Sequence, residues 1–257
     1  MAIVFKKKFP FFERFPGGYF AICGAIFFLI MFGISIALHS ITDPVSWTRH
    51  FVSNMGIGLN GGGLAFSIGI LGLSILLYPF IINLGQQLWM DETKEPRHPK
   101  AHLNNLFLNV AFILAMVAIP GLMMIAFFSM APATIVPHAI GASFFFLGTL
   151  LYGALFWNSL ELNKKSSWLL RICSIMVLGF FICFICSTIV LVIQFPEESQ
   201  LFMSNPTNYV VRILGDVTDT KLAYIRVFEW LFVLAMIVWC LSLGVLSVKL
   251  MENKKHK

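Results

Sequence analysis

The stretch YFAICGAIFFLIMFGISIAL, residues 19–38, decides the fold class of this chain. It contains no charged side chain, and about 20 apolar residues in a helix are needed to cross the hydrocarbon core of a bilayer. Because backbone groups inside a bilayer must be hydrogen-bonded within the protein, such a segment spans as an α-helix. The Lys residues before it also suggest a signal peptide, but no small-x-small cleavage site follows the run. We therefore expect an uncleaved first transmembrane helix.

Five further apolar stretches predict an all-α, polytopic membrane bundle of six helices that forms one domain over residues 1–257. Apolar residues make up 58% of the chain and charged residues only 12%. A water-soluble domain of this length needs far more charge on its surface, so the composition indicates an integral membrane protein. The expected spans are residues 19–39, 62–89, 103–128, 136–157, 168–193 and 224–249.

The distribution of Lys and Arg predicts the orientation of the bundle. Of the 18 Lys and Arg, all but Arg49, Arg212, Lys221 and Arg226 fall on the side of the two termini. Cytoplasmic loops carry the excess of positive charge in membrane proteins, so both termini are expected in the cytoplasm. The connections after the first, third and fifth spans then face outward. Because the basic residues gather at helix ends, we expect no nucleic-acid partner.

The outward connection after the first span reads WTRHFVSNMGIGLNGGGLAF, residues 47–66, and is rich in polar residues and glycine. Several side chains between residues 47 and 60 are too apolar for a solvated loop, so we expect residues 47–60 to fold down onto the bundle. These side chains are Trp47, Phe51, Val52, Met55 and Ile57.

Polar residues also converge on the outer ends of different helices, and they form our candidate site: Ser53, Asn54, His138, Arg226 and Glu229. One interpretation is interfacial anchoring with hydrogen bonds at helix ends. The other is a shared pocket for a lipid headgroup, with Arg226 or Arg49 on a phosphate. Under both, we expect Ser53, Asn54, His138 and Glu229 to share one hydrogen-bonded network, because a buried polar group without a partner costs about 1–3 kcal/mol.

Three stretches of the chain resemble the Frag/DRAM/Sfk group of six-helix membrane proteins and a related prokaryotic family of unknown function. Residues 51–56, FVSNMG, are similar to that group's hydrophobic-Ser-Asp-x-Gly loop. Residues 136–142, VPHAIGA, are followed by aromatic residues and glycine at the expected spacing, and residues 228–230, FEW, open the last helix. The resemblance covers the six spans in order.

Two departures from the family pattern concern the outer loop. Asn54 stands where an Asp is usual, and Asn60 with Gly61 replaces a common Pro-acidic pair. If that Asp is catalytic or binds metal in the family, the activity is in question for this chain. What the resemblance implies is a role in membrane-lipid homeostasis, because eukaryotic members are linked to lysosomal membranes, GPI-lipid maturation and lipid asymmetry.

Cofactor and metal sites are not expected. His98 and His102 have helical spacing, but Pro99 between them breaks the helix that would align them. All five Cys fall inside apolar runs, which argues against a disulfide framework. Ionisable residues mark ion and proton pathways through membranes, and none lies near the centre of an expected span.

Three functional hypotheses follow, in decreasing order of support. The first is a non-enzymatic protein that binds a membrane lipid or a protein partner at its outer face, with no catalytic residue. The second is an intramembrane lipid-modifying enzyme with His138 as base, oriented by Glu229 or Asn54, which requires hydrogen-bond contact. The third is a transporter, which needs a polar cavity at the bilayer midplane.

The orientation is testable by labelling a single cysteine in the connection between the fifth and sixth spans. In a Cys-free background, Ser204→Cys should react with an impermeant thiol reagent on intact cells, because fourteen of the basic residues lie on the other side. Labelling that requires permeabilised cells would show the reverse orientation.

Overall fold

The computed structural model describes residues 9–46, 48–50, 52–57, 60–89, 100–128, 134–163, 168–194 and 223–255, with Gln200 and Ser204 as isolated positions. Throughout these residues the regular structure is helical and there are no strands. Two short elements, α2 (Pro10–Arg14) and the 3-10 helix η1 (Val52–Ile57), accompany the long helices. The long helices are α3 (Gly18–His39), α4 (Gly62–Leu88), α5 (Ala101–Phe127), α6 (Ile135–Leu162), α7 (Trp168–Gln194) and α10 (Ala223–Lys255).

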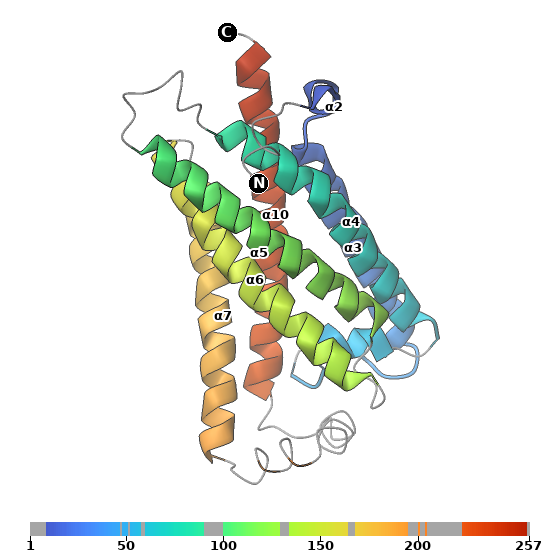
Figure 1. Cartoon of the computed structure of the whole chain (residues 1–257). Coiled ribbons are helices and arrows are strands. Elements are labelled where there is room, and N and C mark those ends of the chain that lie inside the picture. The colour runs from blue at the N-terminus through green and yellow to red at the C-terminus, as the bar shows by residue number, and fades with distance from the viewer. Residues whose placement is uncertain are drawn as a thin grey trace.

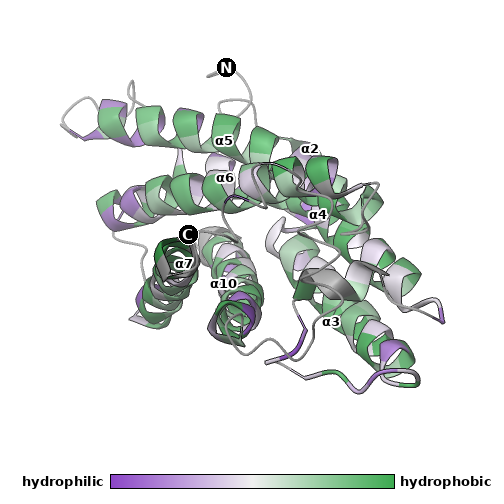
Figure 2. Ribbon diagram, turned by 90° about the horizontal axis from the view of Figure 1, so that it is seen from below, coloured by the Kyte–Doolittle hydropathy of each residue, from purple (hydrophilic) through white to green (hydrophobic). Residues whose placement is uncertain are grey.

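The six long helices are each apolar and long enough to cross a membrane, which confirms the expected fold class. Figure 2 shows hydrophobic residues along most of their length, with hydrophilic residues mainly at their ends. Two helices are longer than the apolar count suggested: α6 continues past residue 157 to Leu162, and α10 past residue 249 to Lys255. An α-helix continues as long as its backbone hydrogen bonds do, even beyond the hydrocarbon core of the bilayer. Polar turns therefore extend both α6 and α10.

The helices pack as sequential hairpins. α3 lies against α4 and α5 against α6, while α10 inserts beside both α3 and α7. In Figure 1, α5 and α6 run obliquely to the nearly upright α7 and α10. The η1 segment lies at the end of the bundle where α3, α5 and α7 finish.

Two pairs of helices approach through glycine. A Cβ on Gly121 of α5 would lie 2.6 Å from the Gly141 carbonyl oxygen of α6, and one on Gly18 of α3 would lie 2.1 Å from the Gly244 oxygen of α10. In a bilayer, helices associate through van der Waals packing and lipid chains compete for the same surfaces, so close backbone approach is a main source of adhesion.

Buried amides fix the bundle at the end opposite η1. The Asn104 side chain of α5 donates to the Leu88 carbonyl oxygen of α4 at 3.0 Å and accepts from the Ser159 hydroxyl of α6 at 2.7 Å. Asn83 of α4 similarly accepts from the backbone N–H of Gly17 at 3.0 Å and from the Ser247 hydroxyl of α10 at 3.4 Å. These bonds tie α4 to three of its neighbours.

The glycine contact between α5 and α6 predicts that a Gly→Ala substitution will change stability in opposite directions at a packed and at an open helical position. Gly121→Ala should lower the thermal stability of the detergent-solubilised protein, because forcing the Cβ against the backbone costs about 1–3 kcal/mol. The Cβ added by Gly179→Ala in α7 would meet open space. This variant should keep or raise the thermal stability, because alanine favours a helix over glycine by up to about 1 kcal/mol. Equal unfolding temperatures for the two variants would contradict the contact.

Candidate functional site

One face of α10 holds the covering segment, which we define as residues 48–50 and 52–57, against the bundle. The Arg226 guanidinium donates through Nη1 to the Thr48 carbonyl oxygen at 3.0 Å. The Trp230 indole N–H donates to the His50 carbonyl oxygen at 2.8 Å. The Glu229 carboxylate accepts the backbone N–H of Val52 at 3.0 Å. Residues spaced by three and four share one face of a helix, so a single turn of α10 supplies all three bonds.

Three side chains of the covering segment are buried, although the segment contains no α-helix. Met55 is 0% exposed, Val52 4% and the His50 side chain belongs to the buried set. This arrangement confirms, for the described residues, the expectation that the segment folds onto the bundle. Trp47 and Phe51 and the side chain of Ile57 lie outside the described residues.

His50 is anchored in a tight turn beside the end of α3. Its Nε2 is 2.9 Å from the Asp43 carboxylate, and its Nδ1 accepts the backbone N–H of Ser46 at 3.1 Å. The ring of His39 packs edge-on against it with centroids 5.4 Å apart. The turn therefore presents the His50 carbonyl to Trp230.

The same three side chains have the spacing of a metal site, since the ligand atoms of His39, Asp43 and His50 lie within 4.8 Å of one another. However, His50 Nδ1 accepts a backbone N–H, so the ring proton must be on Nε2. A metal would need the lone pair of that same nitrogen. We therefore interpret the group as a hydrogen bond in which Asp43 orients His50.

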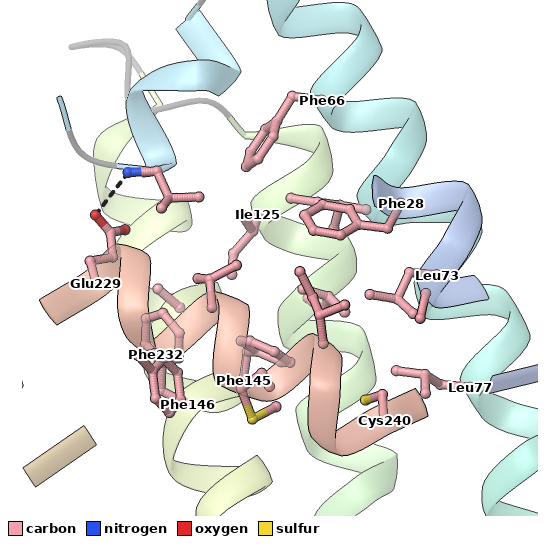
Figure 3. Close-up of a pocket in the computed structure, with 18 of the residues that line it drawn as sticks. Phe28, Phe66, Leu73, Leu77, Ile125, Phe145, Phe146, Glu229, Phe232 and Cys240 are labelled. Carbon is pink, nitrogen blue, oxygen red and sulfur yellow. Dashed lines mark hydrogen bonds between the residues drawn. The ribbon is translucent and has the colours of Figure 1, made fainter. Parts of the chain in front are cut away.

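Beneath the covering segment lies a cavity of about 110 Å³, lined by α3, α4, α5, α6 and α10 (Figure 3). Glu229 is at one end of it, and Leu77 and Cys240 are at the other. From Glu229 to Cys240, α10 advances roughly 16 Å at 1.5 Å per residue. That depth is about half of a 30 Å hydrocarbon core. The labelled apolar walls are Phe28, Phe66, Leu73, Leu77, Ile125, Phe145, Phe146, Phe232 and Cys240.

His138 also lines the cavity, near the start of α6. Its Nδ1 is 2.6 Å from the carbonyl oxygen of Phe128, just past the end of α5. A carbonyl can only accept, so Nδ1 carries the proton and Nε2 of the neutral ring is an acceptor. The bond holds the start of α6 against the end of α5, although the connection between them is only partly described.

The candidate residues divide into three groups. Glu229 and His138 both line the cavity and are both buried, at 7% and 6% exposure. Arg226, 1% exposed, holds the covering segment, whereas Arg49 is exposed. The side chains of Ser53 and Asn54 lie outside the described residues, as does His98 of the pair considered for metal.

The described bonds of Glu229 and His138 lead to two different backbone groups. Glu229 accepts the N–H of Val52 and His138 bonds to the Phe128 carbonyl oxygen. The backbone of Phe128 thus takes the place at Nδ1 that a carboxylate holds in a histidine–carboxylate dyad. A single network that includes Ser53 and Asn54 stays a prediction.

Sequence reasoning did not assign the roles of Trp230, His50 and Asp43. The spacing of residues 226, 229 and 230 at the start of a span is a usable signal, because it places three polar groups on one helix face. It does not reveal their partners, which are about 180 residues distant in the chain.

A second cavity, of about 280 Å³, lies between α6, α7 and α10. Its lining includes Trp157 and Trp239 but no titratable side chain. Thr149, Asn158 and Ser174 supply polar groups there, but the smaller cavity under the covering segment is the better candidate because the ionisable Glu229 and His138 both line it.

Comparison of the chain with protein-family models, with curated proteins and with solved structures finds no match. The functional argument therefore rests on the cavity and its covering segment. The structure itself shows an integral membrane bundle with a partly polar cavity at one end.

Trp230→Phe should loosen the covering segment, because it removes the N–H donated to the buried His50 carbonyl while keeping most of the aromatic ring. A lost bond of about 1.4 kcal/mol makes local opening about tenfold more frequent. Limited trypsin digestion should then cleave after Arg49 faster. Trp168→Phe, at a 73% exposed position in α7, is the matched control and should leave the rate unchanged. Equal cleavage rates for the two variants would contradict the assignment.

Proposed function

We propose that this integral membrane protein is non-enzymatic and binds one apolar chain of a membrane lipid in the cavity beneath the covering segment. The observation that carries the proposal is the cavity itself, whose walls come from five helices and are mostly apolar, with Glu229, His138 and Tyr152 as the polar exceptions. A role in membrane-lipid homeostasis, as the resemblance to the Frag/DRAM/Sfk group implies, is part of the proposal.

The cavity dimensions favour one lipid chain over two. An apolar cavity of about 150 Å³ in a soluble protein binds benzene, so 110 Å³ accommodates a comparable part of a single chain. The depth of roughly 16 Å along α10 from Glu229 to Cys240 matches a chain that runs from the interface toward the bilayer midplane. The excess of Lys and Arg on the side of the termini supports an outer location for the covering segment.

Binding is favoured over catalysis by the partners of His138. In a histidine–carboxylate pair the carboxylate accepts the ring N–H, but here the Phe128 carbonyl occupies Nδ1 and Glu229 holds Val52. A transporter would need a polar path at the midplane, and the lining there includes the apolar Leu77 and Cys240. Among the described lining residues, the Tyr152 hydroxyl is the one polar group besides Glu229 and His138. A protein partner at the outer face is the remaining alternative for the covering segment.

Photochemical crosslinking tests the proposal with the same substitution on two faces of α6. The protein is reconstituted in bilayers that contain a monoacylglycerol with a diazirine midway along its chain. Crosslinks are expected on α10 between Phe232 and Cys240, because this stretch lines the cavity. Ala142→Phe places a ring at the cavity wall and should reduce them several-fold, whereas Ala139→Phe, on an exposed face, should not.

Elution as a single species and unchanged thermal stability serve as the folding control for both variants. Crosslinks confined to lipid-facing positions, or equal yields from the two Phe variants, would contradict lipid binding in the cavity.

A further inference from the structure

We infer that the lipid bound in this cavity is an uncharged lipid alcohol, whose hydroxyl donates to Glu229 or to His138 while its chain lies among the apolar walls. This inference rests on the proposed function and adds the chemistry of the headgroup. It replaces the interpretation in which an arginine binds a lipid phosphate.

Two of the polar side chains that line the cavity, Glu229 and His138, offer acceptors, and the Tyr152 hydroxyl lines it as well. The Glu229 carboxylate accepts the Val52 N–H on Oε2, and a carboxylate has two oxygens with about four lone-pair sites. His138 donates through Nδ1 to the Phe128 carbonyl, so its Nε2 is an acceptor in the neutral ring. The Val52 N–H, a donor at this end of the cavity, is already directed to Glu229. A ligand head that brings an O–H donor complements this arrangement.

A phosphate or carboxylate head is disfavoured in the same place. It would bring a second negative charge next to Glu229, which is 7% exposed and therefore weakly screened by water. Arg226 does not line the cavity, and its Nη1 donates to the Thr48 carbonyl oxygen.

A zwitterionic head is disfavoured for a related reason. The ammonium of phosphatidylethanolamine could approach a carboxylate, but its phosphate is attached a few bonds away and would have to enter the same buried space. A hydroxyl places a single small donor there with no charge to desolvate. The expected ligand is therefore a lipid with an aliphatic chain that ends in an alcohol.

A series of probes with one identical chain tests the inference on the unmodified protein in detergent. The probes are oleyl alcohol, methyl oleyl ether, oleate and oleoyl lysophosphatidate, with binding measured by native mass spectrometry and by the shift in unfolding temperature. Oleyl alcohol should bind about tenfold more tightly than the ether, because a hydrogen bond to a charged acceptor is lost in the ether. It should also bind more tightly than either anion.

Glu229→Gln provides the second arm. The amide oxygen can still accept the Val52 N–H, but the other atom becomes a donor and the charge is lost. The preference for oleyl alcohol over oleate should therefore fall several-fold. Glu252→Gln, at an exposed position near the far end of α10, is the matched control and should leave the preference unchanged.

The outcomes separate this inference from the proposed function. If oleate, lysophosphatidate or the ether binds as tightly as the alcohol, the headgroup inference is overturned while lipid binding stands. If none of the four probes binds, lipid binding itself is overturned. If Glu229→Gln is poorly folded, the comparison of the four probes on the unmodified protein still decides the inference.

Discussion

The hydrogen bond from the Val52 N–H to the Glu229 carboxylate is the interaction on which the site depends. Backbone polar groups that are buried away from water need hydrogen-bond partners in the protein. The covering segment obtains them from one turn of α10, which also supplies Arg226 and Trp230. Because Glu229 serves both this bond and the cavity, the closure of the segment and the chemistry of the cavity are linked through one carboxylate.

The bundle keeps a space beneath this segment because its close contacts lie elsewhere. Glycine brings α5 against α6 and α3 against α10, and buried amides fix the far end. Between these contacts, aromatic side chains such as Phe146 and Phe232, with centroids 5.2 Å apart, bridge α6 and α10. Large rigid rings cannot fill every irregular gap between oblique helices, and the cavity lies among them.

The sequence was sufficient for the six spans, since length and hydrophobicity alone determine which segments cross a bilayer. It also indicated that Val52 and Met55 would be buried. The continuation of α6 to Leu162 was missed because an apolar count stops at the first polar turn, although the helix does not.

The hydrogen-bond partners of the site residues were harder to predict from the sequence. Glu229 and His138 were identified as candidates from their positions at helix ends, but their partners, Val52 and the Phe128 carbonyl, depend on how the helices pack. The amide clusters around Asn83 and Asn104 escaped notice because they carry no charge. A search restricted to ionisable residues does not detect them.

The most direct test of lipid binding in this cavity is an experimental structure of the protein in native-like lipid nanodiscs. Our account predicts continuous, elongated density that begins beside Glu229 and runs along α10 toward Cys240, under an ordered covering segment. A cavity closed by side chains, with lipid density only on the outer surface of the bundle, would contradict it.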